Sequence, residues 1–233
     1  ALYSACGLPL RLVCPALIKE LFLVIMQPTE GFSFVVKNEL FYCLILLTYC
    51  TNFFIFGYIQ ALPAFIDVFN GTPRELGLMF SCAGLGALSG LLTAGKVNIN
   101  KNLGAIILSS ASFFSVLIIL VSLVGVGIMP TYLPFTNILL IFPLATIGHF
   151  GNGFYMLSTY AVIQSKVPEN IRGRVMGIVA IHISIGVLGG LWVGGIGEIF
   201  NMRVGVGSGP IICIILIIYL YIFKKSIRNL QKI

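Results

Sequence analysis

Six long apolar stretches divide this chain of 233 residues, and they constrain its fold more than any other feature. A helix rises about 1.5 Å per residue, so roughly 20 apolar residues cross the hydrocarbon core of a bilayer. An isolated span must also satisfy its own backbone hydrogen bonds, which requires a helix. The sequence therefore predicts an all-α integral membrane protein, a bundle of six transmembrane helices at residues 40–66, 76–95, 103–128, 138–163, 175–199 and 205–223.

Composition excludes the soluble enzyme classes. Only 9% of the residues are charged and 58% are hydrophobic, whereas a soluble domain carries about 25% charged residues. The six cysteines all lie in apolar stretches, and none has the spacing of a Cys-x-x-Cys or Cys/His metal site. We therefore interpret them as buried free thiols, and we expect no cofactor and no bound metal.

The chain divides into three regions. Residues 1–38 are interrupted by prolines and charges, and they are expected to form the end of a preceding helix or an interfacial helix, followed by a cytoplasmic connecting loop. Residues 39–223 form the six-helix transmembrane bundle. Residues 224–233 are predicted to be a basic cytoplasmic tail.

The basic residues predict an orientation. Placing the loops on alternate sides leaves only Arg74 and Arg203 outside and Arg11 unassigned, and it puts the remaining basic residues inside. This is the positive-inside bias of a multi-pass protein in the cell (plasma) membrane, with both termini cytoplasmic. It also accounts for the net charge of +7 with the lipid bilayer as partner and no nucleic acid. The residues placed inside are Lys19, Lys37, Lys96, Lys101, Lys166, Arg172, Arg174, Lys224, Lys225, Arg228 and Lys232.

The most specific local pattern is the segment 167–177, which reads Val-Pro-Glu-Asn-Ile-Arg-Gly-Arg-Val-Met-Gly. Pro168 is expected to end one helix, and Glu169 to lie near the start of the next, where the helix dipole favours an acid. Arg172 and Arg174 would anchor this entry at the lipid headgroups. Cytoplasmic loops are commonly basic, but this ordered string of residues is a much more specific pattern than a high content of basic residues.

The string resembles the loop between helices ten and eleven of the major facilitator superfamily, in its bacterial efflux branch. That branch includes enterobactin-type siderophore exporters and macrolide efflux proteins. Residues 30–38 resemble the lead-in to helix seven, residues 76–90 resemble helix eight, and residues 148–164 resemble helix ten. The resemblance covers about residues 30–223. It implies the C-terminal six-helix half of that fold, with an N-terminal six-helix half supplied by the same gene product or by a separate chain.

The resemblance also assigns a cytoplasmic gating loop, formed by Glu169, Arg172, Gly173 and Arg174. A second gating loop usually follows helix eight in the superfamily and pairs glycine with an aspartate and several basic residues. The segment 90–102 offers glycine and two lysines there but no acid, so the chain departs from the family pattern at this loop.

Two glycine stripes predict close helix packing. Gly86 and Gly90 recur every four residues in the second span, followed by an alanine at the same interval, and Gly186, Gly190 and Gly194 do so in the fifth. Small residues at this spacing let helix backbones approach closely in a membrane. In the superfamily, helices eight and eleven face the N-terminal half, so the resemblance implies that both stripes contact six helices outside this chain.

Two polar stripes lie within the spans. Side chains four residues apart share a helix face, and an ionisable residue in mid-membrane, such as His149, is a functional hypothesis by default. The resemblance places both stripes on cavity-lining helices, which predicts a water-accessible path for a substrate or a proton; the alternative is a neutral His149 bonded to a neighbouring backbone group or to Asn152. The stripes are Tyr49, Asn52, Phe56 and Gln60 in the first span, and His149, Asn152, Met156 and Thr159 in the fourth.

The function that follows is a secondary active transporter half, with no enzymatic activity, that exports a hydrophobic or amphiphilic small molecule by alternating access. One alternative is a non-transporting remnant of a split or truncated transporter gene. A distant alternative is an intramembrane serine protease that uses Ser89 with His149 or His182. The glycine that such a protease needs two residues before the serine is replaced by Ala87.

Overall fold

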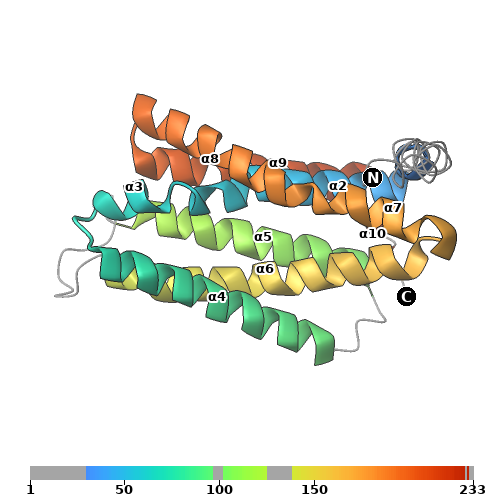
Figure 1. Ribbon diagram of the computed structural model, residues 1–233, viewed down its shortest axis with the longest axis horizontal. Helices are drawn as coiled ribbons and strands as arrows, with labels where there is room; N and C mark the ends of the chain where they lie inside the picture. The colour runs from blue at the N-terminus through green and yellow to red at the C-terminus, as the bar shows by residue number, and fades with distance from the viewer. Residues whose placement is uncertain (1–29, 97–101, 125–137, 229, 231–233) are drawn as a thin grey trace, which may run out of the picture.

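The computed structural model describes residues 30–96, 102–124, 138–228 and 230. These residues contain helices and no strands, and six helices are long and apolar enough to cross a membrane. The predicted all-α bundle is therefore confirmed (Figure 1). The first span begins with α2 (Glu39–Cys50), and the fifth consists of α7 (Glu169–Ala180) and α8 (His182–Ile199). The other four spans are α4 (Pro73–Lys96), α5 (Leu103–Leu123), α6 (Ile138–Lys166) and α9 (Met202–Phe223).

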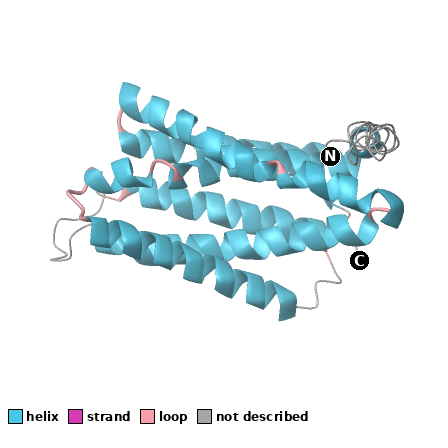
Figure 2. Cartoon of the chain, viewed as in Figure 1, coloured by secondary structure: helices cyan, strands magenta, loops and turns pink. Residues whose placement is uncertain are grey.

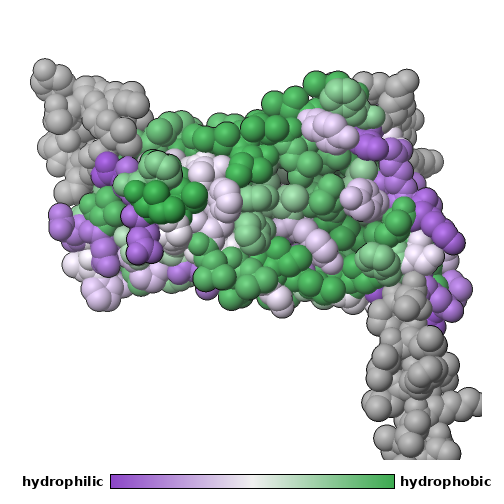
Figure 3. Space-filling view, turned by 90° about the horizontal axis from the view of Figure 1, so that it is seen from above, coloured by the Kyte–Doolittle hydropathy of each residue, from purple (hydrophilic) through white to green (hydrophobic). Residues whose placement is uncertain are grey.

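The helices alternate in direction, so each loop lies at one of the two ends of the bundle. Most of the basic residues lie in loops at the same end. One end, which we call the lysine-rich end, is where α4 and α6 finish at Lys96 and Lys166 and where Lys224 follows α9. At the other, which we call the Arg203 end, Arg74 lies near the start of α4 and Arg203 near the start of α9. Hydrophilic residues gather at both ends, and apolar side chains cover the band between them, as expected for a protein in a bilayer (Figure 3).

The order in which the helices pack side by side differs from their order along the chain. Helix α4 packs on α6, α6 on α5, α5 on α9, and α9 on α8, while α8 packs on the continuation of α2. Spans one to three and spans four to six form two three-helix sets, and the second helix of each set packs against the first helix of the other.

The first span is broken, although the sequence predicts one helix over residues 40–66. After α2 the chain forms a π-helical turn, η1 (Thr51–Ile55), then a 3₁₀ turn, η2 (Phe56–Ile59), and resumes as α3 (Leu62–Asp67) (Figure 2). Thr51 and Asn52 donate side-chain hydrogen bonds to carbonyls four residues earlier, and such bonds bend helices. Pro63 has no N–H to donate to the helical ladder, so it fits the first turn of α3, where its N–H would have no partner within the helix.

The turn before α4 is fixed by local chemistry. Asn70 has a φ of 53°, in the left-handed region that asparagine tolerates. The carboxylate of Glu75 accepts hydrogen bonds from both the backbone N–H and the hydroxyl of Thr72, at 2.6 and 3.0 Å. Pro73 occupies the first position of α4, where its missing N–H costs nothing. The residues at the tip of this loop therefore specify where the second span begins.

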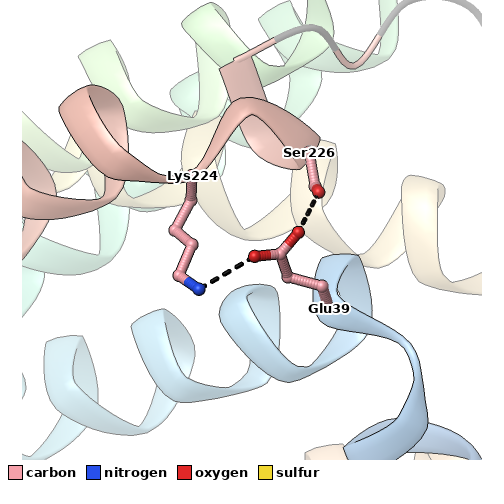
Figure 4. Close-up of polar contacts among 3 residues, drawn as sticks. All are labelled: Glu39, Lys224 and Ser226. Atoms are coloured by element: carbon pink, nitrogen blue, oxygen red, sulfur yellow. Dashed lines mark hydrogen bonds and ion pairs between the residues drawn. The ribbon is translucent and has the colours of Figure 1, made fainter.

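The C-terminal segment does not extend away from the bundle as a tail in the part that the structure describes. A short helix, α10 (Lys225–Arg228), lies against α2, α5 and α9. Ile227 and Leu230 are buried, and Glu39 at the start of α2 accepts hydrogen bonds from Lys224 (2.8 Å) and from Ser226 (Figure 4). Two apolar side chains therefore dock the described part of the predicted basic cytoplasmic tail, residues 224–228 and 230, onto the bundle.

Glycines of the second span make a contact inside this chain. A Cβ at Gly86 would overlap the carbonyl of Thr146, and one at Gly90 would overlap the carbonyl of Phe150, both on α6. The expectation that this stripe faces six other helices is therefore wrong. Helix α6 occupies the stripe because only glycine lets the two backbones approach this closely.

The fifth span repeats this arrangement. Gly186 lies beside Asn52, and a Cβ at Gly190 would lie 2.6 Å from the Cβ of Gln60, so both glycines face the broken first span. Gly189, which is not part of the predicted stripe, makes the tightest approach, against the backbone of Phe53. Only Gly194 of the predicted stripe has open space around it, with no atom within 4 Å of a built Cβ.

Gly90→Ala should therefore destabilise the bundle, because the new methyl group forces α4 away from α6. Overpacking of this kind costs about 1–3 kcal/mol. Gly84→Ala is the matched control on the same helix, since a Cβ there meets no atom within 4 Å and alanine favours a helix by about 1 kcal/mol. Thermal unfolding of the detergent-solubilised protein checks this. Equal melting temperatures for the two variants would contradict the close crossing.

Candidate functional site

An apolar groove of about 600 Å³ lies beside the first span, towards the lysine-rich end. Its walls come from residues 30–37, α2 and α7, and its lining residues carry no charge. Two tyrosines, Tyr42 and Tyr49, supply the only hydroxyl groups among them. The lining residues are Phe32, Val35, Val36, Tyr42, Ile45, Leu46, Tyr49, Ile178 and Ile181.

Tyr49 connects this groove to a break in the fifth span. The helix tightens between α7 and α8, where the N–H of Ile181 bonds the carbonyl of Ile178 three residues back. The hydroxyl of Tyr49 donates to the same Ile178 carbonyl at 2.5 Å. The carbonyl of Ile178 therefore accepts from the backbone of its own span and from Tyr49 of the neighbouring span.

His182 lies at the same break. Its Nδ1 lies 2.7 Å from the carbonyl of Val179, so Nδ1 carries the proton and donates. In the neutral ring Nε2 then accepts from the hydroxyl of Tyr160 on α6, at 3.1 Å. His182 therefore joins α6 to the break between α7 and α8.

The remaining residues of the first polar stripe face different surroundings. Asn52 is buried and donates to the carbonyl of Thr48, while its backbone lies beside Gly186 of α8. Phe56 is half-buried, with its ring 6.2 Å from the ring of His149. Gln60 is exposed. The break after Cys50 disrupts the regular helical spacing, so the four side chains do not form the single stripe that the spacing predicts.

His149 lies in an enclosed aromatic site. Its side chain is 2% exposed, with the rings of Phe114 and Tyr58 at 5.3 and 6.0 Å. Nδ1 donates to the carbonyl of Ala145 at 2.9 Å, and Nε2 faces the hydroxyl of Tyr58 at 3.4 Å. This arrangement fits a neutral histidine bonded to the backbone of its own helix. The contact with Phe56 is the point at which the two predicted stripes meet.

The other residues of the α6 stripe are mostly buried. Asn152 is 9% exposed and Thr159 is 1% exposed, whereas Met156 is partly buried against the core cluster at the lysine-rich end. A substrate path along α6 thus remains a prediction. In this conformation its polar groups lie inside the bundle rather than along an open surface.

The sequence reasoning missed a buried hydroxyl cluster. The hydroxyls of Tyr155 and Thr48 lie 3.1 Å apart in the fully buried centre of the bundle, and Thr51 and Thr159 lie next to Tyr155. The cluster joins α6 to α2 and η1. Two threonines three residues apart in the apolar first span are the signal that could have revealed it, because a polar residue inside a membrane helix needs a partner.

Charged residues of the predicted gating loop are placed at the start of α7. Arg174 pairs with Glu30, and Arg172 lies 3.9 Å from Glu169. The Arg172 guanidinium also donates to the carbonyl of Val167, at 3.4 Å. Gly173 has open space around it. The loop is therefore joined to the segment before α2 by one ion pair, and it faces the lysine-rich end.

The described residues show no arrangement typical of a metal site, or of a protease site formed by Ser89 and His149. Within the ranges that the structure describes, no three His, Cys, Asp or Glu side chains gather to hold a metal ion. Ser89 donates to the carbonyl of Gly86 at 2.8 Å, and both nitrogens of His149 contact other atoms. Ser89 and His149 are therefore not arranged as a nucleophile and its base.

Six antiparallel apolar helices, with closely packed glycines between them, define a multi-pass membrane protein in the part of the chain that the structure describes. A family model for the Major Facilitator Superfamily matches residues 15–186, well over half of the chain. The chain therefore belongs to the Major Facilitator Superfamily, a family of membrane transporters, and its six helices form a half-domain of that fold. No curated protein and no solved structure matches it.

Lys224→Met removes the ammonium that pairs with Glu39, and we expect a small decrease in melting temperature because the pair is solvent-exposed. The hydrogen bond to Glu39 raises the pKa of Lys224 above its ordinary value of 10.5. A raised lysine pKa stabilises the fold at neutral pH, and this contribution disappears as the pH rises through the shifted value. The difference between wild type and variant should therefore stay constant from about pH 7 to 9 and shrink at higher pH.

Lys166→Met is the control, since Lys166 is exposed at the same end and has no ion pair among the described residues. About 1 M salt should weaken the effect of Lys224→Met, because the screening length falls to about 3 Å. Equal melting temperatures for Lys224→Met and wild type in low salt would show that Glu39 is not held by this pair.

Proposed function

We propose that this chain is the C-terminal half of a secondary active transporter that exports a hydrophobic or amphiphilic small molecule by alternating access. Family membership supplies the general class, and the efflux-type string at residues 167–177 supports the direction of transport. The observation that carries the proposal is the apolar groove beside Tyr49, which lies between α2 and the fifth span at the break between α7 and α8.

The groove supports a substrate class. Its walls are hydrocarbon and aromatic, and the described lining residues include no charged side chain that would pair with an ion. Binding sites for small molecules are mostly apolar, with a few polar groups that fix orientation. The hydroxyls of Tyr42 and Tyr49 can serve this purpose, so a hydrophobic molecule with a small polar group fits better than a sugar or an inorganic ion.

Exposed apolar faces support the pairing with another six-helix bundle. Leu85 and Leu88 on α4, and Ile183 and Leu191 on α8, are all more than half exposed, with Leu191 at 74%. Lipid can cover part of this surface. Exchange between inward-open and outward-open states requires a second bundle that moves against the first, and α4 and α8 offer the least buried spans for that contact.

The orientation follows from the charges. We propose that the lysine-rich end is cytoplasmic, so that Arg174 and Glu30 lie at the inner surface and Arg203 at the outer surface. A fluorescent protein fused after Ile233 should then fold and fluoresce in the cytoplasm. Alkaline phosphatase fused in the loop after Phe200 should be active outside. The opposite result for both fusions would reverse the orientation.

Transport itself can be measured in cells that lack their own multidrug pumps, by retention of a fluorescent lipophilic dye. Cells that make the gene product containing this chain should retain several-fold less dye. Tyr49→Ala should abolish most of this effect, because it removes a groove wall and the donor to Ile178. Tyr219→Ala is the control, since Tyr219 is half exposed on α9 and lies outside the groove.

The same assay separates the proposal from its alternative. A gene product that inserts in the membrane but leaves dye retention unchanged would contradict export and favour a non-transporting remnant. If Tyr49→Ala and Tyr219→Ala reduce dye efflux equally, the chain is still a transporter, but the groove is not its substrate site.

A further inference from the structure

A histidine lies at the break in the fifth span, and the proposed function does not use it. His182 begins α8, and its side chain is 7% exposed. An ionisable side chain within a membrane span is rare and usually functional, because a charge is costly there. Histidine is also the side chain that ordinarily changes its charge between about pH 5 and 8. The surroundings of His182 therefore decide whether it can respond to pH.

The two ring nitrogens of His182 have different partners. Nδ1 donates to the carbonyl of Val179 at 2.7 Å, and Nε2 lies 3.1 Å from the hydroxyl of Tyr160. A hydroxyl can donate or accept. In the neutral ring it donates to Nε2. Once Nε2 gains a proton, the same hydroxyl accepts from it, and only the hydroxyl hydrogen turns. The site can therefore hold either charge state of His182 with both nitrogens hydrogen-bonded.

No carboxylate forms an ion pair with His182 among the residues that the structure describes. Tyr160 is the titratable side chain that contacts it from α6. From α2, Tyr49 reaches the Ile178 carbonyl, one residue before the Val179 carbonyl that accepts from His182. A proton on His182 would therefore be held by neutral oxygen atoms and not by a counter-charge.

Titratable groups on the other elements packed around α8 have their own surroundings. Segment η1 has no titratable side chain, and the Tyr58 hydroxyl of η2 faces the other histidine of the bundle. Cys50 of α2 and Cys213 of α9 pack in the apolar core cluster nearer the Arg203 end. In the fifth span itself, Arg174 has its own ion pair, and Glu198 lies at the far end of α8. Within the described ranges, Tyr160 is thus the titratable group that hydrogen-bonds to His182.

The same break forms part of the Tyr49 groove. Ile178, one helical turn before His182, and Ile181, directly before it, both line the groove. Ile181 is 50% exposed. The Ile178 carbonyl accepts from the Tyr49 hydroxyl, and the next carbonyl in the chain accepts from His182. A hydrophobic molecule in the groove would therefore cover the residues beside His182 and exclude water from the break.

We propose that His182 makes occupancy of the Tyr49 groove dependent on pH, an inference that rests on the proposed function. The neutral histidine tolerates dry, apolar surroundings. The imidazolium has no carboxylate partner among the described residues, so it depends on water near the break, and removal of that water is costly. A bound hydrophobic molecule and a proton on His182 therefore oppose each other. Acid conditions release the molecule from the groove.

Binding of Nile red to the full-length protein in lipid nanodiscs tests this link. The dye is lipophilic and keeps the same charge at about pH 5.5 and pH 8, and Tyr49→Ala gives the background of dye dissolved in lipid. Wild type should bind at least about fivefold more weakly at the lower pH, the lower end of ordinary coupling between two sites. His182→Gln should bind equally at both, because glutamine stays neutral and keeps a donor and an acceptor.

The second histidine provides a matched control. His149 is enclosed by aromatic rings and lies outside the groove, so His149→Gln should keep the pH dependence of wild type. Tyr160→Phe leaves His182 in place and removes the hydroxyl that accepts from the imidazolium. Its loss of binding at about pH 5.5 should be smaller than that of wild type. This variant also decides the matter if His182→Gln fails to fold.

Carbon NMR of protein labelled in its histidine rings measures the protonation itself. The signal that His182→Gln removes should change position between about pH 5 and 8. The signal that His149→Gln removes is the internal reference. A His182 signal that keeps one position over this range would overturn the proposal, whatever the dye does.

The dye assay also separates this proposal from the proposed function. Wild type that binds equally at both pH values would overturn the role of His182 and leave the groove as the substrate site. Loss of the pH dependence in His149→Gln, or its persistence in His182→Gln, would assign the effect to another group. No binding above the Tyr49→Ala background at either pH would contradict the proposed function, and with it this inference.

Discussion

Direct contact between helix backbones is the constraint on which the rest of this structure depends. A membrane supplies little hydrophobic drive for helix association, so stability must come from close packing. Helix α4 meets α6 at Gly90, and α8 meets the broken first span at Gly189. Each crossing also has a glycine on the partner, Gly153 and Gly57. These two equivalent contacts join the two three-helix sets into one bundle.

The glycine contacts and the broken spans occur together, between the first and fifth spans. Tight approach at Gly57 and Gly189 brings the first and fifth spans close enough for Tyr49 to reach the carbonyl of Ile178. The hydroxyl is a second donor to the Ile178 carbonyl at the break between α7 and α8, and His182 donates to the next carbonyl, that of Val179. Irregular backbone thus occurs where neighbouring side chains can compensate for it, beside the apolar groove that we assign to substrate.

Ion pairs contribute less to the fold than their number at the lysine-rich end implies. The pairs formed by Glu39 and Glu30 are solvent-accessible, and exposed pairs contribute little to stability. Burial of Ile227 and Leu230 is the stronger reason that the C-terminal segment docks on the bundle.

The sequence by itself determined the helical class, the number of spans and the loop before α4, because hydrophobic length and local capping at Thr72 and Glu75 act over a few residues. It also predicted that glycines pack closely. Only the tertiary structure decided which helices those glycines meet, that His149 is enclosed by aromatic rings, and that Tyr49 bonds Ile178. These outcomes depend on residues of different helices, from Phe114 and His149, 35 positions apart, to Tyr49 and Ile178, 129 positions apart. Periodicity along one helix carries no information about which neighbour will lie across from it.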